Sequence, residues 1–187
     1  MWGRIAIVIC CLMLWTVLAG KVYILHADDD GERHRERTRE RHGKRDHDSI
    51  KPISNAIYKE ECGGCHFPYQ PELLPSASWR KLVAGLDDHF GMPVAFDDGS
   101  KSAILDYLTA NGAERSSAKR AVRIMRSLGS DVPSRITDIP YIRKKHHKIA
   151  ASVLERESIG SLSNCTACHR TAEEGIYDED NVTVPRQ

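Results

Sequence analysis

Cys62-Gly63-Gly64-Cys65-His66 is the stretch around which the chain is organised, and its spacing returns at Cys165-Thr166-Ala167-Cys168-His169. Two thiols separated by two residues reach the two vinyl groups of one porphyrin and form thioethers, and the following histidine takes one axial position on the iron. The sequence therefore predicts two covalently bound c-type haems. The residues that bind the cofactors are Cys62, Cys65, His66, Cys165, Cys168 and His169.

Other uses of a Cys-x-x-Cys pair fit this chain less well. A thioredoxin-like redox pair needs a βαβ setting and no adjacent histidine. A zinc ribbon needs two such pairs about 15 to 20 residues apart, whereas Cys65 and Cys165 are separated by a hundred positions. Disulfides would leave His66 and His169 without a role. The remaining two cysteines of the six, Cys10 and Cys11, lie in the apolar leader, so the rest of the chain holds no further thiol.

Few residues can supply a second axial ligand to each iron. Outside the motifs and the charged segment before them, the donors are the histidines His89, His146 and His147 and the methionines Met92 and Met125. We expect His89 to share a helix face with Leu82 and Leu86 and to be the distal ligand of the first haem. A structural histidine at a helix C-terminus is the competing interpretation.

Helical spacing separates the two adjacent histidines. His146 falls on a stripe with Ile142 and Ile149, whereas His147 points about 100° away. We therefore predict His66, His89, His146 and His169 as the iron ligands, with His147 on the surface. Which distal histidine serves which haem stays open, because a crossed arrangement is compatible with the sequence.

The first fifty residues are unlike the rest. Residues 1–27 are predicted to be a secretory signal, with Arg4 before an apolar run and an imperfect cleavage site after Ala27. An uncleaved leader would instead anchor the chain to a membrane; either way the remainder is exported, to the periplasm. Residues 28–51 form a highly charged tether with almost nothing to bury. Its histidines and the one before it are interpreted as solvated, namely His26, His34, His42 and His47.

Residues 52–187 are predicted to be the dihaem domain, with a first haem lobe at 52–130 and a second at 131–187. Apolar periodicity predicts helices over 78–90, 97–111, 118–128 and 142–154, with an extended stretch over 133–140. No run of alternating strands is present. We expect a mostly α fold with long irregular loops, in which two covalent haems form much of the core. The formal charge of +1 argues against a nucleic-acid-binding surface.

The chain resembles the bacterial diheme cytochrome c family over nearly all of residues 54–185. The similar segments are 61–75, Ser78-Trp79, His89-Phe90-Gly91, Tyr107-Leu108, 135–137, 141–149, 164–169 and 175–185. The resemblance implies bis-histidine ligation of both haems and electron relay in the periplasm. Members of that family partner a small oxygen-binding haem protein or a membrane cytochrome b.

Two closed coordination spheres favour outer-sphere electron transfer over chemistry on a bound molecule. We expect an electron-transfer protein and not an enzyme, with a membrane cytochrome b or quinol-linked donor and a soluble haem protein as acceptor. Two alternatives remain. One is a dihaem peroxidase-like enzyme in which one iron opens on reduction, and the other is a haem-based sensor or structural module of a larger complex.

Overall fold

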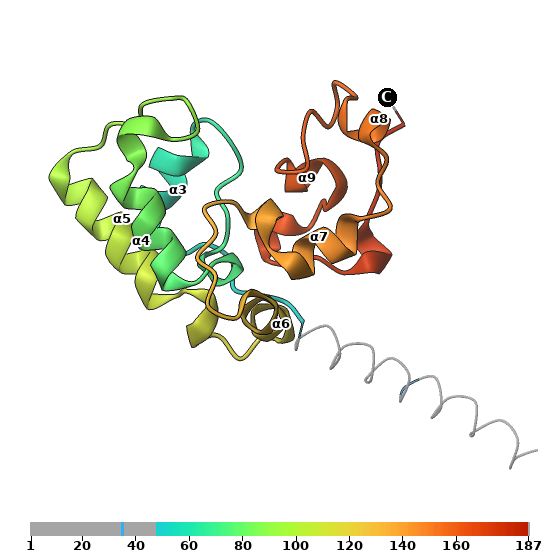
Figure 1. The fold of residues 1–187 in the computed structure, drawn as a ribbon, viewed down its shortest axis with the longest axis horizontal. Helices are drawn as coiled ribbons and strands as arrows, with labels where there is room; N and C mark the ends of the chain where they lie inside the picture. The colour runs from blue at the N-terminus through green and yellow to red at the C-terminus, as the bar shows by residue number, and fades with distance from the viewer. Residues whose placement is uncertain (1–34, 36–47, 187) are drawn as a thin grey trace, which may run out of the picture. The chain divides into compact units, whose positions relative to one another are not determined.

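The computed structural model describes Arg35 and residues 48–186, which are drawn in colour in Figure 1. The predicted signal and most of the tether, with its histidines, lie outside the described residues. Residues 47–187 form one compact unit, separate from residues 1–46. The predicted division of this unit into two lobes stays a prediction. Its α-helices are α3 Ala56–Gly63, α4 Ser76–Ala84, α5 Asp98–Ala110, α6 Lys119–Leu128, α7 Pro140–His146, α8 Ala151–Leu154 and α9 Cys165–Cys168.

Short 3₁₀ turns and irregular segments join these helices. The turns are η1 Pro71–Leu73, η2 Leu86–Asp88, η3 Ala113–Arg115, η4 Ile136–Asp138, η5 Ala172–Glu174 and η6 Glu179–Asn181. Within residues 48–186 there is no strand, and extended pairing is limited to isolated bridges between His89 and Met92 and between His169 and Val182. The predicted mostly α fold with long irregular loops is confirmed. No helix in this range is long and apolar enough to cross a bilayer.

Side-chain caps explain where two of the helices begin. The Asn55 side chain accepts a hydrogen bond from the Tyr58 amide at 2.8 Å and starts α3 just before the first motif. The Asp97 carboxylate accepts from the Ser100 amide at 3.0 Å and starts α5. Both interactions satisfy amide groups that have no partner inside the helix, so the chain enters each helix at a defined residue.

The helices α3, α4 and α5 share one part of the core. The helix α5 packs against α3 and α4, and its Ile104 and Leu108 are buried with Trp79 and Val83 of α4. The Trp79 indole donates to the Pro71 carbonyl at 2.8 Å, so the polar group of this large side chain is satisfied. This packing fixes the end of α3, where the first motif begins.

The helices α6 and α7 pack against each other. Ala121, Ile124 and Leu128 of α6 are buried, as is Ile139 immediately before α7. Pro140 stands at the first position of α7, where its missing amide costs no helical hydrogen bond. This pairing fixes α7, and with it His146 at the last position of that helix.

Several predicted boundaries are wrong. The expected helix over 78–90 begins at Ser76 and ends at Ala84, because Gly85 interrupts it before η2. The expected extended stretch over 133–140 contains η4 and the first residue of α7. The expected helix over 142–154 is broken between His146 and Ala151 into α7 and α8. Local periodicity predicted the apolar faces, but not the breaks that long-range packing imposes.

Candidate functional site

The first motif lies at the end of α3 and in the turn that follows. Cys62 is half-buried against the core, whereas Cys65 and His66 are exposed. The Nδ1 of His66 lies 2.8 Å from the Phe67 carbonyl oxygen, which can only accept. Because Nδ1 therefore carries the proton, the Nε2 lone pair of His66 is left available to a metal.

A tight loop after η2 holds His89 opposite this motif. The His89 amide donates to the Met92 carbonyl at 2.9 Å, and the Gly91 amide donates to the Asp88 carboxylate at 2.9 Å. Within the loop, Phe90 has a φ of 56°, a left-handed conformation that is costly for an aromatic residue. The loop therefore holds a strained residue directly after His89, and its hydrogen bonds fix the backbone from which the His89 side chain projects.

The structure brings His66 and His89 together. Their ring centroids are 6.2 Å apart and the ring planes differ by 14°. A metal–imidazole bond of about 2 Å, with the ring centroid about 1.2 Å behind the bonding nitrogen, puts the centroids of two imidazoles on opposite faces of one metal about 6.4 Å apart. The observed separation therefore fits two imidazoles that would hold one iron between them.

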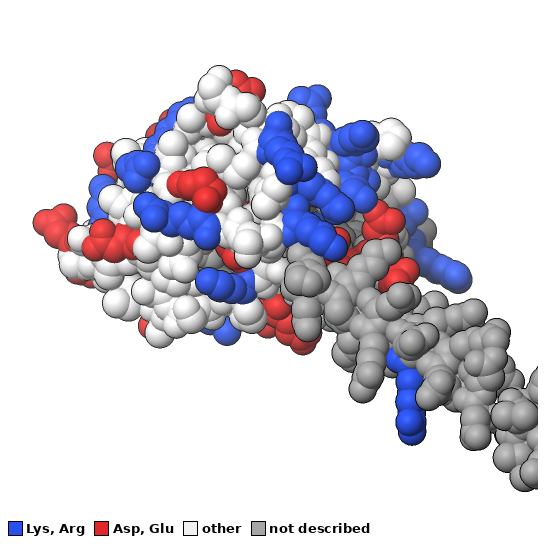
Figure 2. All heavy atoms as spheres, turned by 90° about the horizontal axis from the view of Figure 1, so that it is seen from below, with Lys and Arg blue, Asp and Glu red and all other residues white. Residues whose placement is uncertain are grey.

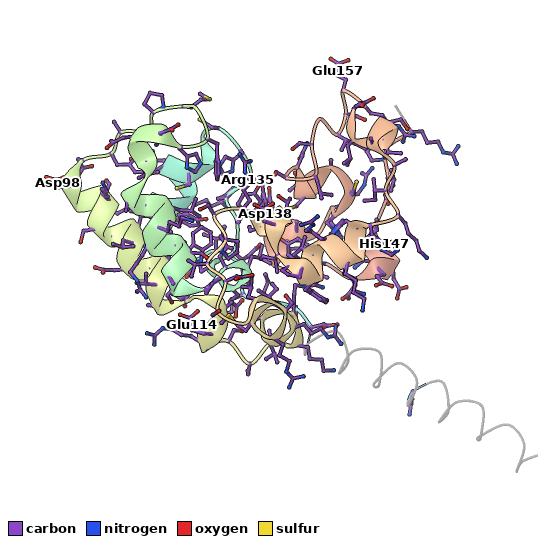
Figure 3. All side chains as sticks on the ribbon, viewed as in Figure 1. Asp98, Glu114, Arg135, Asp138, His147 and Glu157 are labelled. Carbon is purple, nitrogen blue, oxygen red and sulfur yellow. The ribbon has the colours of Figure 1, made fainter. Side chains whose placement is uncertain are left out.

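The second motif forms the short helix α9, and its histidine faces α7. The ring centroids of His146 and His169 are 6.1 Å apart, with planes that differ by 75°. The Nδ1 of His146 lies 2.8 Å from the Ile142 carbonyl oxygen, which again leaves Nε2 available. His147, labelled in Figure 3, makes a similar bond to the Lys144 carbonyl, but its ring is exposed and packs on no other ring among residues 48–186.

The surroundings keep His169 neutral, as a metal ligand must be. Burial, helped by the nearby His146 and Arg120, lowers the pKa of His169 to about 4. Its Nδ1 is buried without a partner among the described residues, an orphan polar atom that points to a missing group in this region. Burial, with help from His66 and Arg135, also lowers the pKa of His89.

The first thiol of each motif is not activated as a nucleophile. Burial raises the pKa of both Cys62 and Cys165 to about 11. A redox-active Cys-x-x-Cys pair has a lowered thiol pKa instead. The two sulfur atoms pack against the apolar core, which suits attachment to a porphyrin edge better than exchange chemistry.

These observations together fit two haems. Each Cys-x-x-Cys-His motif has one further histidine at the separation that an iron between the rings requires. Within residues 48–186, the structure contains no cluster of three or more His, Cys, Asp or Glu side chains suited to another metal. Of the alternative donors, Met92 is 64% exposed, and Met125 is half-buried within α6. The ligand roles of the four histidines stay a prediction.

Sequence reasoning missed the residues that connect the two motifs. The Tyr69 ring lies 5.3 Å from the His66 ring, and its hydroxyl donates to the Ser163 carbonyl at 2.7 Å, two residues before Cys165. The buried Tyr177 packs 5.3 Å from the His169 ring and donates to Gln70. Only the position of Tyr69 and Gln70 directly after the first motif could have drawn attention to them.

Arg135 was also missed as a neighbour of the first histidine pair. Its guanidinium lies 3.9 Å above the Phe90 ring (Figure 3), and that ring meets His89 edge to face at 4.8 Å. The Arg135 cation therefore helps to lower the pKa of His89 through its charge, and it also packs on Phe90, the residue next to His89. Cation–aromatic contacts of this kind depend on loop geometry that no local pattern specifies.

Comparison with known proteins agrees with the site geometry. A family model described as "Dihaem cytochrome c" matches residues 58–177. The diheme cytochrome c from Rhodobacter sphaeroides is 37% identical over 68% of this chain and all of that one, with a TM-score of 0.61. A diheme cytochrome type c from Shewanella baltica OS155 is 33% identical over 72% of this chain and 96% of that one, with a TM-score of 0.58. A search of curated proteins finds no match.

The family model covers more than half of the chain and includes the first motif, the second motif and all three histidines between them. It ends at Tyr177, the residue that packs on His169. Membership of this family implies electron transfer. The chain belongs to the dihaem cytochrome c family and carries two covalently bound c-type haems.

Proposed function

We propose that this protein is a periplasmic electron relay in which each haem iron is held between two histidines. His66 and His89 serve the haem on Cys62 and Cys65, and His146 and His169 serve the haem on Cys165 and Cys168. The observation that carries the proposal is the spacing of the two pairs, 6.2 and 6.1 Å between ring centroids. When bound, the haems supply one-electron oxidation and reduction.

The residues of the chain keep both irons closed to other molecules. An imidazole on each face leaves no position for oxygen, peroxide or carbon monoxide. Burial favours the neutral form of His169, and the hydrogen bonds that His66 and His146 donate through Nδ1 leave Nε2 of each ring as the nitrogen that would bind iron. Such a site changes oxidation state with little rearrangement, which suits transfer to and from other redox centres.

The packing between the motifs supports transfer from one haem to the other. Tyr69 contacts His66 and bonds to Ser163, next to the second motif. Gln70 is fully buried and bonds to Ala172 and Tyr177. These contacts hold the two attachment segments at a fixed separation, and a rigid separation keeps the rate of transfer between the haems constant.

The family resemblance supports the choice of partners. We propose a membrane cytochrome b or another quinol-linked protein as the donor and a soluble haem protein as the acceptor. Haem attachment of this type takes place outside the cytoplasm, and the predicted leader would export the chain there. No catalytic residue is assigned, because the proposed role is carriage of electrons.

Titration of the purified holoprotein tests this function. Anaerobic reduction should consume two electrons per chain, and the spectrum of the reduced protein should stay six-coordinate and low-spin under carbon monoxide. Hydrogen peroxide should not be turned over in the presence of an electron donor. A carbon monoxide shift in one haem on reduction, together with peroxide turnover, would instead establish the peroxidase-like alternative.

A further inference from the structure

Charge is distributed very unevenly along the described part of the chain. Residues 119–148 contain nine Lys and Arg side chains and two Asp. The remainder of residues 48–186 contains nine Lys and Arg against seventeen Asp and Glu. A nearly neutral total therefore conceals one strongly basic segment in an otherwise acidic protein, and such a segment creates a local field whatever the net charge.

The fold gathers this basic segment into one surface. The helices α6 and α7, which pack together, bury Ala121 and Ile124 of α6, and their charged residues other than the half-buried Arg120 are exposed. Figure 2 shows Lys and Arg side chains gathered over one part of the surface, with few acidic ones among them. We define the basic face by six exposed residues, which are Arg123, Arg126, Arg143, Lys144, Lys145 and Lys148.

Most of this charge is not paired with a carboxylate among the described residues. Arg123 lies 3.6 Å from the Asp48 carboxylate, and Lys145 lies 2.5 Å from that of Glu179. Among residues 48–186, no carboxylate forms an ion pair with the other four members of the basic face. Four uncompensated cations on two neighbouring helices attract an anionic partner and have no evident role in stability, because exposed charges contribute little to it.

A predicted iron ligand lies next to the basic face. His146 is the last residue of α7, and it is flanked in sequence by Lys144, Lys145 and Lys148. Its ring is half-buried and faces His169 at 6.1 Å. A protein bound to the basic face would therefore lie next to the second haem, and electron-transfer rates fall steeply as the distance between redox centres grows.

We propose that the basic face docks an acidic one-electron redox protein and that electrons enter or leave through the haem on Cys165 and Cys168. One electron passes between the partner and that haem, whose iron alternates between ferric and ferrous. This inference rests on the proposed electron-relay function and adds the chemistry of one partner. An anionic lipid surface could also meet these cations, but lipid binding gives no reason to place them around an iron ligand.

Reduction of the oxidised holoprotein by a flavodoxin hydroquinone, an acidic one-electron donor, tests the docking surface by stopped-flow spectroscopy. The second-order rate should be high at low salt and fall as salt screens the attraction. The triple variant Arg143→Glu, Lys144→Glu, Lys148→Glu should react at least about tenfold more slowly at low salt. Among residues 48–186, the side chains of these three residues form no hydrogen bond or ion pair, and their replacement leaves the bond between His146 and the Ile142 carbonyl in place.

A matched charge reversal away from the basic face is the control. Lys51→Glu, Arg80→Glu, Lys81→Glu changes the net charge equally at exposed positions outside α6 and α7, and its rate should stay within about twofold of the native rate. Equal slowing of both variants, or a native rate independent of salt, would overturn the proposal. If the basic-face variant lost binding to phosphatidylcholine–phosphatidylglycerol vesicles but kept its flavodoxin rate, the surface would be a lipid site. Reduction of both variants by dithionite tests the haems themselves, so a failed relay function is recognised separately.

Discussion

The Tyr177 hydroxyl donates a hydrogen bond of 2.6 Å to the side-chain oxygen of Gln70, 107 positions earlier in the chain, and both side chains are buried. The amide nitrogen of Gln70 donates to the Ala172 carbonyl at 2.5 Å. One side chain that directly follows the first haem motif is thereby fixed to the segment that follows the second. Buried polar pairs of this kind are costly to leave half made.

Tyr177→Phe should therefore destabilise the protein while keeping the ring against His169. The Gln70 oxygen would be left buried without a donor, and the free energy of unfolding should fall by about 1–3 kcal/mol. Denaturant unfolding of the holoprotein, followed by circular dichroism, measures the change. Tyr107→Phe is the control, because that hydroxyl accepts an exposed hydrogen bond from Ser54. An equal loss in both variants would show that the buried pair has no special role.

Removal of single histidines should open single irons. His89→Ala should make one of the two haems high-spin and reactive to carbon monoxide. The alternative sulfur ligand near this loop, Met92, is 64% exposed and so does not replace the lost imidazole. His146→Ala should open the other haem, whereas His147→Ala should open neither, since the exposed His147 ring packs on no other ring in the described part of the chain. Optical spectra with and without carbon monoxide count the opened sites. Opening by His147→Ala but not by His146→Ala would reverse the assignment of these two residues.

The two haems should differ in their electron paramagnetic resonance spectra. The His66 and His89 planes differ by 14° and the His146 and His169 planes by 75°. Two iron d orbitals can take part in π bonding with the axial imidazoles. Parallel imidazoles interact with the same one of these orbitals and separate the two in energy, whereas perpendicular imidazoles leave the two close in energy. The ferric protein should give one rhombic low-spin signal and one with a much larger maximum g value. The rhombic signal should vanish in His89→Ala, and two identical signals would contradict the ring geometry.

The part of the site that follows from sequence is the part encoded by neighbouring residues. Each haem is predicted from a motif of five residues. Helical spacing alone predicts that His146, and not His147, faces the apolar interior. The same spacing predicts a single helix over 142–154, and this prediction is wrong, since the helix is broken between His146 and Ala151. The contacts of Gln70 with Tyr177 and of Arg135 with Phe90 join residues far apart in the chain. No local pattern specifies such pairs, because they depend on how the completed helices pack.

Glu114 should stabilise the protein in a pH-dependent way. Its carboxylate, labelled in Figure 3, accepts from the Ser76 amide at the start of α4 at 3.1 and 3.2 Å. Burial alone would raise the pKa of Glu114, but the hydrogen bonds from Ser76 outweigh it and hold the pKa below its ordinary value of 4.5. A lowered pKa in the folded state gives stability above pH 4.5 that is lost as the pH falls through the folded value.

Glu114→Gln removes the charge and keeps an acceptor, so it should cost about 0.3–1 kcal/mol at pH 7. The difference from the native protein should be smaller at pH 3 than at pH 7, because a falling pH protonates the native carboxyl. Urea unfolding at the two pH values measures both quantities. Asp106→Asn, an exposed change on α5, should be neutral at both. A Glu114→Gln difference that is independent of pH would mean that packing, not charge, is responsible.

Gly175 should be the glycine least tolerant of a side chain. Its φ is 75°, and an added Cβ would lie 1.9 Å from the Ile50 carbonyl oxygen. The Ile50 amide also donates to the Gly175 carbonyl at 3.0 Å, so the segment before the first motif is joined here to the segment after the second.

Gly129 is the control, because it has a φ of 58° with nothing within 4 Å of an added Cβ. An alanine there measures the cost of the left-handed backbone conformation alone. Gly129→Ala should cost about 1 kcal/mol, and Gly175→Ala about 1–3 kcal/mol more because of the clash. Thermal unfolding of both variants measures the difference in stability between them. Equal melting temperatures would show that the segments around Ile50 and Gly175 can move apart without loss of stability.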